Sequence, residues 1–259
     1  MRRLSVLLLT ALMGLAFCGV AEAQKAGLKI SIGRSDVDLA NRTIYFKLNK
    51  PAETAELKAY DLDGNLVGEQ IETYQGAAAG KRLSISWPFL SGDPDNFRIE
   101  LKVTDVNEYW ASFEIVHFYG LIPHEEVVFE SGKSEIRPSE APKLDAALPL
   151  IVEMLRKFQR FSTQLTYSLY IAGHTDTVGS AADNAQLSLD RARAIARYFQ
   201  EGGLKKEKIS IFIRGFGESS LAVPTKDNVD ELRNRRADYI ISNFPPAMPG
   251  TGSWIAIQK

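Results

Sequence analysis

The chain has 259 residues, of which 45% are hydrophobic and 24% are charged, and its formal net charge is −1. This length accommodates two modest domains, and the composition is that of a folded globular protein. Because the charge is nearly neutral and like charges form no blocks, a general electrostatic grip on nucleic acid is excluded.

The N-terminus has the order of a secretory signal. Arg2 and Arg3 precede an apolar run from residue 4 to about residue 20, and small residues follow up to Ala23. The run is shorter than the roughly 20 residues that a spanning helix prefers, which argues against a membrane anchor. We therefore predict a signal peptide over residues 1–23, cleaved after Ala23.

Cys18 is the only cysteine and suggests an alternative, a lipoprotein acylated on its side chain. Such signals have a small residue just before the cysteine, whereas Phe17 is large, so we expect no lipidation at Cys18. Cleavage after Ala23 leaves a chain without disulfides. No later segment is apolar and long enough to span a bilayer as a helix. We expect an exported protein in the periplasm, free or associated with the outer membrane.

Residues 24–120 have the pattern of an all-β domain. Short runs rich in β-branched and aromatic residues alternate with turn signals such as Asp63-Gly64-Asn65. The runs cover 29–32, 42–49, 55–70, 81–87, 97–105 and 109–118. Strands punctuated this regularly predict a β-sandwich of immunoglobulin-like shape. We expect Trp87 and Trp110 in its core. The sequence leaves open whether this domain binds an envelope protein, packs on the second domain or acts as a spacer.

Residues 121–244 have a different pattern, in which strands and helices alternate. Expected elements are a strand and turn at 127–138, a helix at 139–161, a strand at 165–173, a helix at 187–203, a strand at 208–215, a helical turn or two at 226–234 and a strand at 236–242. This order predicts an α/β sandwich with helices packed on a small mixed sheet, and the whole chain is α+β with two domains. Residues 245–259 are rich in proline at their start, and we expect a loosely held tail.

The two expected helices carry specific signals. Ser139 is a candidate cap of the first, and Pro149 is expected to kink or divide it. Ser188 is the candidate cap of the second, which Gly202-Gly203 closes. With that cap, Arg191 lies in the first helical turn, where a cation opposes the helix dipole. A residue placed against the local field in this way indicates a tertiary partner or a ligand.

Asp176 follows the strand that ends at Ala172, and Arg191 lies in the next helix, so both are expected near the carboxyl end of the sheet. Two interpretations remain open on the residues alone. The pair forms a structural salt bridge, or it holds opposite ends of a zwitterion, with Asp176 accepting from an ammonium and Arg191 offering a planar fork to a carboxylate. The side-chain terminus of diaminopimelic acid has that chemistry.

Four segments together resemble the OmpA-like peptidoglycan-binding domain that is also found in Pal and MotB proteins. They are VVFESGKSEIRP, IAGHTDTVGSAADNAQLSLDRARAIARYF, IRGFGESS and NRRADYIIS, within residues 122–243. The resemblance implies non-catalytic, non-covalent binding of diaminopimelate in peptidoglycan stem peptides, which anchors the envelope or an envelope partner to the wall. It also implies that Asp176 and Arg191 are the paired ligand-binding residues, and that Asn184, Arg235 and Glu130 line the same pocket.

Other functions have weaker signals. The three histidines, His117, His124 and His174, lack metal-ligand spacing such as H-E-x-x-H, and we expect neither metal nor cofactor. His117 and His124 are expected at the surface. Ser180 and Ser188 are better explained as helix caps than as nucleophiles, because no G-x-S-x-G motif is present.

A peptidoglycan hydrolase that uses Glu130 and Asp176 as an acid pair is the sharpest enzymatic alternative. The other alternative is a protein-interaction module without a ligand. We expect Gly215 and Gly217 to permit a tight turn rather than to cradle a phosphate.

Overall fold

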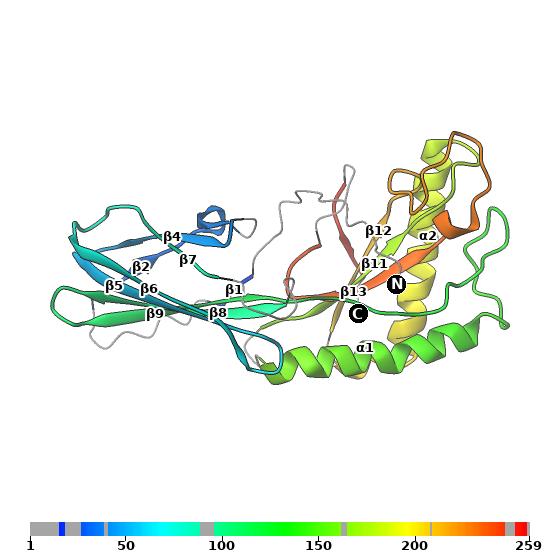
Figure 1. Ribbon diagram of the computed structural model, residues 1–259. Helices are drawn as coiled ribbons and strands as arrows, with labels where there is room; N and C mark the ends of the chain where they lie inside the picture. The colour runs from blue at the N-terminus through cyan, green and yellow to red at the C-terminus, as the bar shows by residue number, and fades with distance from the viewer. Residues whose placement is uncertain are drawn as a thin grey trace, which may run out of the picture. The chain divides into compact units, whose positions relative to one another are not determined.

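The computed structural model of the protein describes residues 16–18, 27–38, 41–88, 96–161, 165–207, 209–246 and 252–257. The chain divides into two compact units, Met1–His117 and Phe118–Lys259 (Figure 1). Most of the predicted signal peptide, including the cleavage site after Ala23, lies outside the described residues. Strand β1 (Ala16–Cys18) is the described part of that segment, and it pairs antiparallel with β9. Over the described ranges, no helix is long and apolar enough to cross a membrane.

The first unit is built from strands, in agreement with the predicted runs. They are β2 (Ile30–Ser31), β3 (Val37–Asp38), β4 (Thr43–Leu48), β5 (Ala52–Tyr60), β6 (Leu66–Ala77), β7 (Leu83–Ser86), β8 (Phe97–Asp105) and β9 (Trp110–His117), with the 3₁₀ helix η1 (Arg34–Asp36) before β3. One antiparallel sheet has the order β1-β9-β8-β5-β6, and in the other β4 pairs with β2, β3 and β7. The immunoglobulin-like topology stays a prediction.

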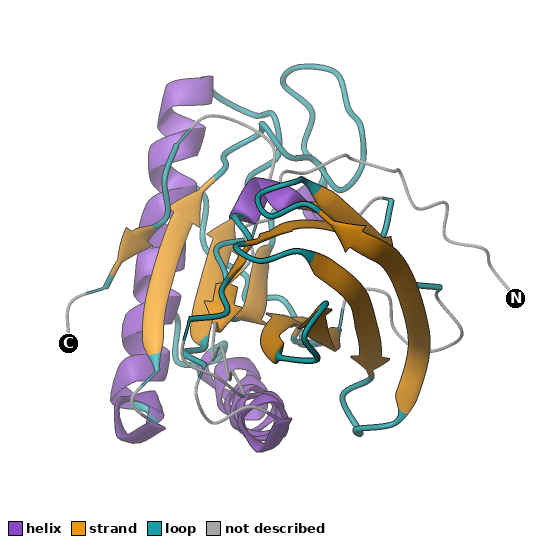
Figure 2. Ribbon diagram, turned by 90° about the vertical axis from the view of Figure 1, so that its left-hand side faces the viewer, coloured by secondary structure: helices purple, strands orange, loops and turns teal. Residues whose placement is uncertain are grey.

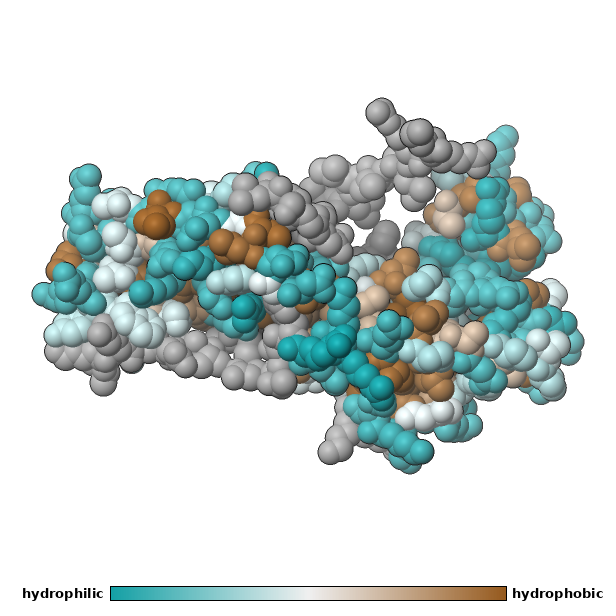
Figure 3. Space-filling model, turned by 60° about the horizontal axis from the view of Figure 1, so that its bottom comes forward, coloured by the Kyte–Doolittle hydropathy of each residue, from teal (hydrophilic) through white to brown (hydrophobic). Residues whose placement is uncertain are grey.

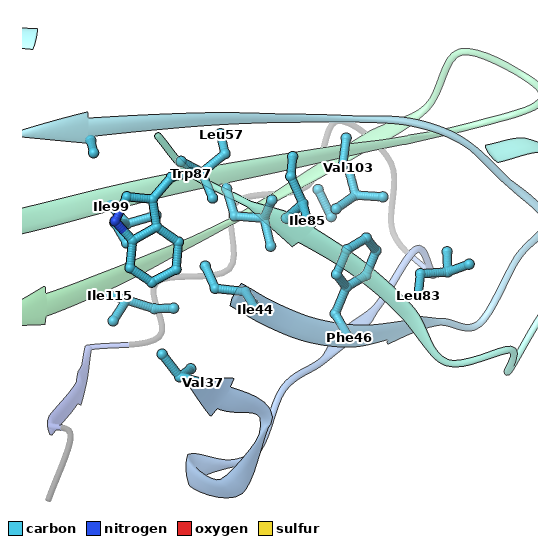
Figure 4. Packing of buried hydrophobic residues seen from close by; sticks show 14 of the residues in the cluster. Val37, Ile44, Phe46, Leu57, Leu83, Ile85, Trp87, Ile99, Val103 and Ile115 are labelled. Atoms are coloured by element: carbon cyan, nitrogen blue, oxygen red, sulfur yellow. The ribbon is translucent and has the colours of Figure 1, made fainter. Parts of the chain in front are cut away.

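The core of this unit lies between its two sheets. Alternate residues of β5, β8 and β9, such as Leu57 and Ile99, meet Ile44 and Phe46 of β4, and all four are nearly fully buried (Figure 4). Trp87 is part of this cluster, as predicted, and is 5% exposed.

The expectation for Trp110 was wrong. In β9 the next residue, Ala111, is the one that is buried and lies opposite the buried Val103, so Trp110 points to the other face of the sheet. There it is half-buried, with Nζ of Lys102 5.5 Å from its ring centroid.

The second unit contains a mixed sheet and two long helices, which lie beside it in Figure 2. Its elements are β10 (Tyr119–Leu121), α1 (Ala141–Phe161), β11 (Ser168–Gly173), α2 (Ala181–Glu201), η2 (Leu204–Glu207), β12 (Ser210–Gly215), η3 (Leu232–Asn234), β13 (Ala237–Ser242) and β14 (Ile255–Ala256). The order is β10-β13-β11-β12-β14, with β11 and β12 parallel and the other pairs antiparallel. The mixed α/β sheet is therefore confirmed. The predicted strand at 127–138 was wrong, because the first strand is β10 and 127–138 form a connection without strands.

Helix α1 runs without interruption through Pro149, contrary to the predicted division. Its buried face includes Leu144, Ile151 and Phe158, whereas Pro149 lies on the exposed face. A proline in a helix leaves the carbonyl four residues earlier without its partner. Here that carbonyl belongs to Asp145, which is also exposed, so water can satisfy it.

Helix α2 begins earlier than predicted. Its N-cap is Ser180, whose Oγ accepts from the backbone N–H of Asp183 at 3.1 Å. Ser188 is a fully buried residue in the middle of the helix. Arg191 therefore lies in the third turn, so the argument from the helix dipole does not apply to it. The helix ends before Gly202, close to the predicted end.

The C-terminal tail is held more firmly than expected. Strand β14 pairs with β12, and the ring of Trp254 packs 5.0 Å from Tyr170 and 6.2 Å from Phe216, measured between centroids. The indole N–H of Trp254 also donates to the carbonyl of Pro246 at 3.1 Å. An edge strand and one large aromatic side chain thus attach the tail to the sheet.

Candidate functional site

A pocket of about 600 Å³ lies at the carboxyl end of β11, beside the first half of α2. Its volume falls within the range of roughly 300–1,000 Å³ that small-molecule sites occupy. Four segments line it: the 128–132 connection, the loop after β11, α2 and the turn before β13. The lining residues are Val128, Phe129, Ser131, Gly132, Thr175, Asp176, Val178, Gly179, Asp183, Asn184, Gln186, Leu187, Asp190, Arg191, Asp230 and Arg235.

Two glycines let α2 lie directly on the strands below the pocket. A Cβ at Gly173 would come within 2.1 Å of the carbonyl oxygen of Ser188, and one at Gly215 within 2.5 Å of the backbone nitrogen of Leu189. Gly215 therefore serves close packing rather than the predicted turn. Gly217, with φ of +52°, does form a turn. The close contact of α2 with the strands at Gly173 and Gly215 fixes the position of the helix, and so the position of Arg191 relative to the loop that carries Asp176.

Asp176 is 6% exposed, and its carboxylate is held by the protein. Its Oδ2 accepts from Nη1 of Arg235 at 2.6 Å, and its Oδ1 accepts from the backbone N–H of Val178 at 3.3 Å. Within the described ranges, no ion pair joins Asp176 to Arg191. The salt-bridge interpretation of that pair is therefore wrong, and the counter-ion of Asp176 is Arg235.

Arg191 is 7% exposed, and its hydrogen bonds go to neutral acceptors. Nε donates to the carbonyl of Lys133 at 3.0 Å and Nη2 to the carbonyl of Glu130 at 3.3 Å, while the guanidinium carbon lies 5.1 Å from the ring centroid of Phe129. Burial lowers the pKa of Arg191, and the charge of Arg235 adds to this, against the opposing charge of Asp176. Arginine still stays charged. A buried cation without an acidic partner favours an anion in the adjoining pocket.

The other predicted site residues lie in different positions. Asn184 holds two loops together, because its Nδ2 donates to the carbonyl of Asp176 at 3.3 Å and to Oε2 of Glu218 at 2.8 Å. Glu130 reaches the site only through its backbone. Its carboxylate is half exposed and pairs with Nζ of Lys133 at 2.5 Å, so it is not among the lining groups.

Three contributors were missed at the sequence level. Asp230 pairs with Arg235 in the pocket wall, although the sequence only indicated a helical turn there. The carbonyl of Lys133 has no sequence signal at all. Glu140 accepts from the backbone N–H of Val128 at 2.9 Å, and the pKa of its carboxyl is lowered by that bond and by Lys143. It thereby holds the connection that supplies the carbonyls bonded to Arg191.

A polar cluster around the buried His174 lies where β11 ends and β13 begins. Nε2 of His174 is 3.1 Å from Oδ2 of Asp238, and Oε2 of Glu126 accepts from the backbone N–H of Ala237 at 2.9 Å. Burial lowers the pKa of His174, although Asp238 partly opposes this, and burial raises the pKa of Glu126. Asp176 follows His174 closely in the chain, and Arg235 comes shortly before Ala237. The cluster therefore supports the two loops that carry Asp176 and Arg235.

The other two histidines are also buried, contrary to the expectation of surface positions. The ring of His117 stacks on Phe97 at 5.3 Å and that of His124 on Tyr239 at 3.8 Å, which explains their burial by aromatic packing. Across the described ranges, no three His, Cys, Asp or Glu side chains gather as metal ligands would.

A second, larger hollow of about 910 Å³ lies between α1 and the end of α2. Its floor includes Leu148, Pro149 and Val152, and Arg156 and Lys206 are among its charged residues. Figure 3 looks from the side on which α1 lies and shows apolar patches broken up by hydrophilic residues on the second unit. In this hollow Arg156 and Glu207 pair with each other at 3.5 Å, and the Arg156 side chain is 66% exposed. Asp176 and Arg191 of the first pocket are both buried and are not paired with each other, so we assign the site to the first pocket.

Residues 128–235 match the family model described as OmpA family, and this range lies within the second unit. Residues 128–235 therefore form an OmpA-like domain, which confirms the resemblance seen in the sequence. The first unit lies outside the match.

Individual relatives are similar over limited stretches. The chain is 30% identical over 127 residues to the photosystem I P700 chlorophyll a apoprotein A2 of Gloeobacter violaceus, covering 47% of this chain and 13% of that protein. It is 34% identical over 94 residues to outer membrane protein A of Serratia odorifera, covering 36% of this chain and 35% of that protein. The chain thus spans about a third or less of these curated relatives.

Among solved structures, the peptidoglycan-associated lipoprotein from Burkholderia pseudomallei is similar with a TM-score of 0.35 and 19% identity. That likeness covers 45% of this chain and 90% of the lipoprotein.

Proposed function

We propose that this protein binds cell-wall peptidoglycan without catalysis, through the diaminopimelate of the stem peptides, and so anchors the envelope or an envelope partner to the wall. The observation that carries the proposal is that a carboxylate and a guanidinium line one pocket of an OmpA-like domain. Asp176 and Arg191 line the same 600 Å³ hollow without bonding to each other, so both are available to one ligand.

A zwitterion suits this arrangement. The ammonium of an amino-acid terminus fits Asp176, whose Oδ1 is engaged only by a long bond to a backbone N–H. The carboxylate of the same terminus fits Arg191, a planar donor that lacks an anionic partner among the described residues. Each charge-assisted hydrogen bond contributes about 1.5–3 kcal/mol. The ammonium and the carboxylate of an amino-acid terminus are attached to the same carbon. A site that bonds to both groups therefore prefers such a terminus to an amine alone.

The test is sedimentation with purified sacculi. We expect Asp176→Ala and Arg191→Ala to abolish co-sedimentation, and Asp176→Asn, which keeps the side-chain shape, to weaken it at least about tenfold. Arg233→Ala is the control, because Arg233 is 69% exposed and pairs with Glu231 outside the pocket lining. Circular dichroism shows that each variant is folded. Unchanged binding in folded Asp176 and Arg191 variants would falsify the assignment of the pocket.

Ligand chemistry gives a second arm. A stem tripeptide that ends in diaminopimelate should bind. The same peptide with lysine lacks the carboxylate at the end of the side chain, so it should bind much more weakly because Arg191 then has no anion. Release of muropeptides from the sacculi would instead indicate a hydrolase. The side chain of Glu130 pairs with Lys133 and does not line the pocket, which argues against an acid pair of Glu130 with Asp176.

Localisation and partners are part of the same proposal. The predicted signal over residues 1–23 directs the protein to the periplasm, where the wall is accessible, and association with the outer membrane is then through a partner. The first unit is the candidate for binding that partner, since the OmpA-like domain already accounts for wall binding. A pull-down from envelope extracts with residues 24–120 identifies it.

A further inference from the structure

We propose that Asp230 is an internal competitor of the ligand, whose carboxylate occupies the guanidinium of Arg235 until a carboxylate of the bound peptide displaces it. The inference rests on the binding function proposed above and concerns a residue outside the expected set. Asp230 and Arg235 both line the pocket, and they form an ion pair there.

The bonds of Arg235 leave part of its guanidinium unused. Its Nη1 donates to Oδ2 of Asp176 at 2.6 Å and also to Oδ1 of Asp230. Among the described residues, its Nε and Nη2 form no hydrogen bond. Carboxylates bind arginine best through two parallel N–H bonds. Asp230 bonds to a single nitrogen, Nη1, which it shares with Asp176. A ligand carboxylate that spans Nη1 and Nη2 forms two parallel bonds where Asp230 forms one, and it needs the place at Nη1 that Asp230 occupies.

The two aspartates differ in how easily they leave. The side chain of Asp176 is 9% exposed and also accepts from Val178, so its position is fixed by the fold. The side chain of Asp230 is 74% exposed. Exposed ion pairs are weak, because water replaces the lost partner at little cost. Asp230 is therefore the carboxylate that an incoming ligand replaces.

The backbone keeps Asp230 beside the pocket. Oγ1 of Thr177, the neighbour of Asp176, donates to the carbonyl of Lys226 at 2.7 Å and accepts from the N–H of Val229 at 3.0 Å. The N–H of Asn228 donates to the carbonyl of Thr177 at 2.9 Å. These bonds tie the segment before Asp230 to the loop of Asp176. Displacement therefore needs only a rotation of the Asp230 side chain.

The charge of the pocket acts in the same direction. Its charged lining residues are Asp176, Asp183, Asp190, Asp230, Arg191 and Arg235, so acidic groups are in excess. A ligand carboxylate at Arg235 is repelled by the two acids bonded to its guanidinium, Asp176 and Asp230, of which Asp230 is the more exposed. Removing the charge of Asp230 therefore lowers the repulsion of the ligand carboxylate and also weakens the bond that occupies the guanidinium of Arg235.

The experiment is calorimetric titration of the full chain with the tripeptide L-Ala-D-Glu-meso-diaminopimelate at low salt. We expect Asp230→Asn to bind about two- to fivefold more tightly than the wild type. The matched control is Asp227→Asn, which removes the same charge from the same loop. Asp227 bonds to the N–H of Asn228, which asparagine can also do, and it does not line the pocket. Its affinity should equal that of the wild type.

The outcomes separate this inference from the proposed function. Equal or weaker binding by Asp230→Asn overturns the competitor, while wild-type binding still supports the pocket. An equal gain in Asp227→Asn also overturns it, because a long-range charge effect then explains the change. Binding by Asp230→Asn alone supports strong competition. Binding by none of the three proteins contradicts both the competitor and the proposed function.

Discussion

The hydroxyl of Ser188, in the middle of α2, accepts a hydrogen bond from the backbone N–H of Gly217, in the turn after β12, at 2.9 Å. The same hydroxyl donates to the carbonyl of Ala185 at 2.9 Å. A buried side chain thus joins the helix that carries Arg191 to the end of the central strands. This contact requires the close approach that Gly173 and Gly215 permit, so helix position and site geometry depend on the same few small residues.

We predict that Gly215→Ala destabilises the protein by about 1–3 kcal/mol and weakens binding of the stem tripeptide, because the added methyl group meets the backbone of α2 and must displace it. Urea unfolding and calorimetry measure the two effects. Gly33→Ala is the control. Its Cβ would meet Oδ2 of Asp36 at 3.3 Å and no backbone atom, and Gly33 is exposed, so the expected cost is below about 1 kcal/mol. Equal costs in both variants would contradict the role given to the helix contact.

The positions of most elements could be predicted because local patterns dominate them. The strands of the first unit follow alternation and turn residues, and β11, β12 and β13 follow short apolar runs. The start of α2 could not be placed correctly, because Ser180 and Ser188 are both acceptable caps in the sequence. In the structure Ser180 is the cap and Ser188 is bonded to Gly217, 29 residues away, and such a contact has no local signal.

The structure places the two main residues proposed from the sequence, Asp176 and Arg191, in one pocket, whereas their bonding partners were not foreseen. Asp176 and Arg191 belong to a motif, so their resemblance to a family was visible. The pairing of Asp176 with Arg235 depends on how the loop after β11 meets the turn before β13, which are 59 residues apart. The tail was missed for a similar reason, since only the folded sheet shows the face that Trp254 covers.

The pairing of Asp176 with Arg235 leads to a stability prediction. In Arg235→Gln the largely buried Asp176 loses its bonded counter-ion, and we expect a loss of about 1–2 kcal/mol. This value is below that of a fully buried pair because the Arg235 side chain is 33% exposed. Arg233→Gln removes an arginine two positions away that is 69% exposed, so it should cost less than about 0.5 kcal/mol. Urea unfolding of both variants checks this, and similar losses would show that the pair contributes nothing particular to the fold.

The last prediction concerns His174, which is buried beside Asp238 and has a pKa below its ordinary value of 6.5 because of that burial. As pH falls below about 6.5, the unfolded chain takes up a proton on this histidine before the folded protein does, so stability decreases. Glu126 acts in the opposite sense, because its pKa is raised above 4.5 and the folded protein takes up that proton first.

The variant His174→Gln isolates the histidine contribution, since it keeps a donor for Asp238 and cannot titrate. We expect the wild type to lose more unfolding free energy than His174→Gln between pH 7.5 and 5.5, by at most about 1.4 kcal/mol per pH unit. Urea unfolding at the two pH values measures the difference. Parallel losses in both proteins would show that His174 does not titrate differently in the folded and unfolded states. The same comparison with the tripeptide bound tests whether protonation of His174 also weakens the binding of the tripeptide by the neighbouring pocket.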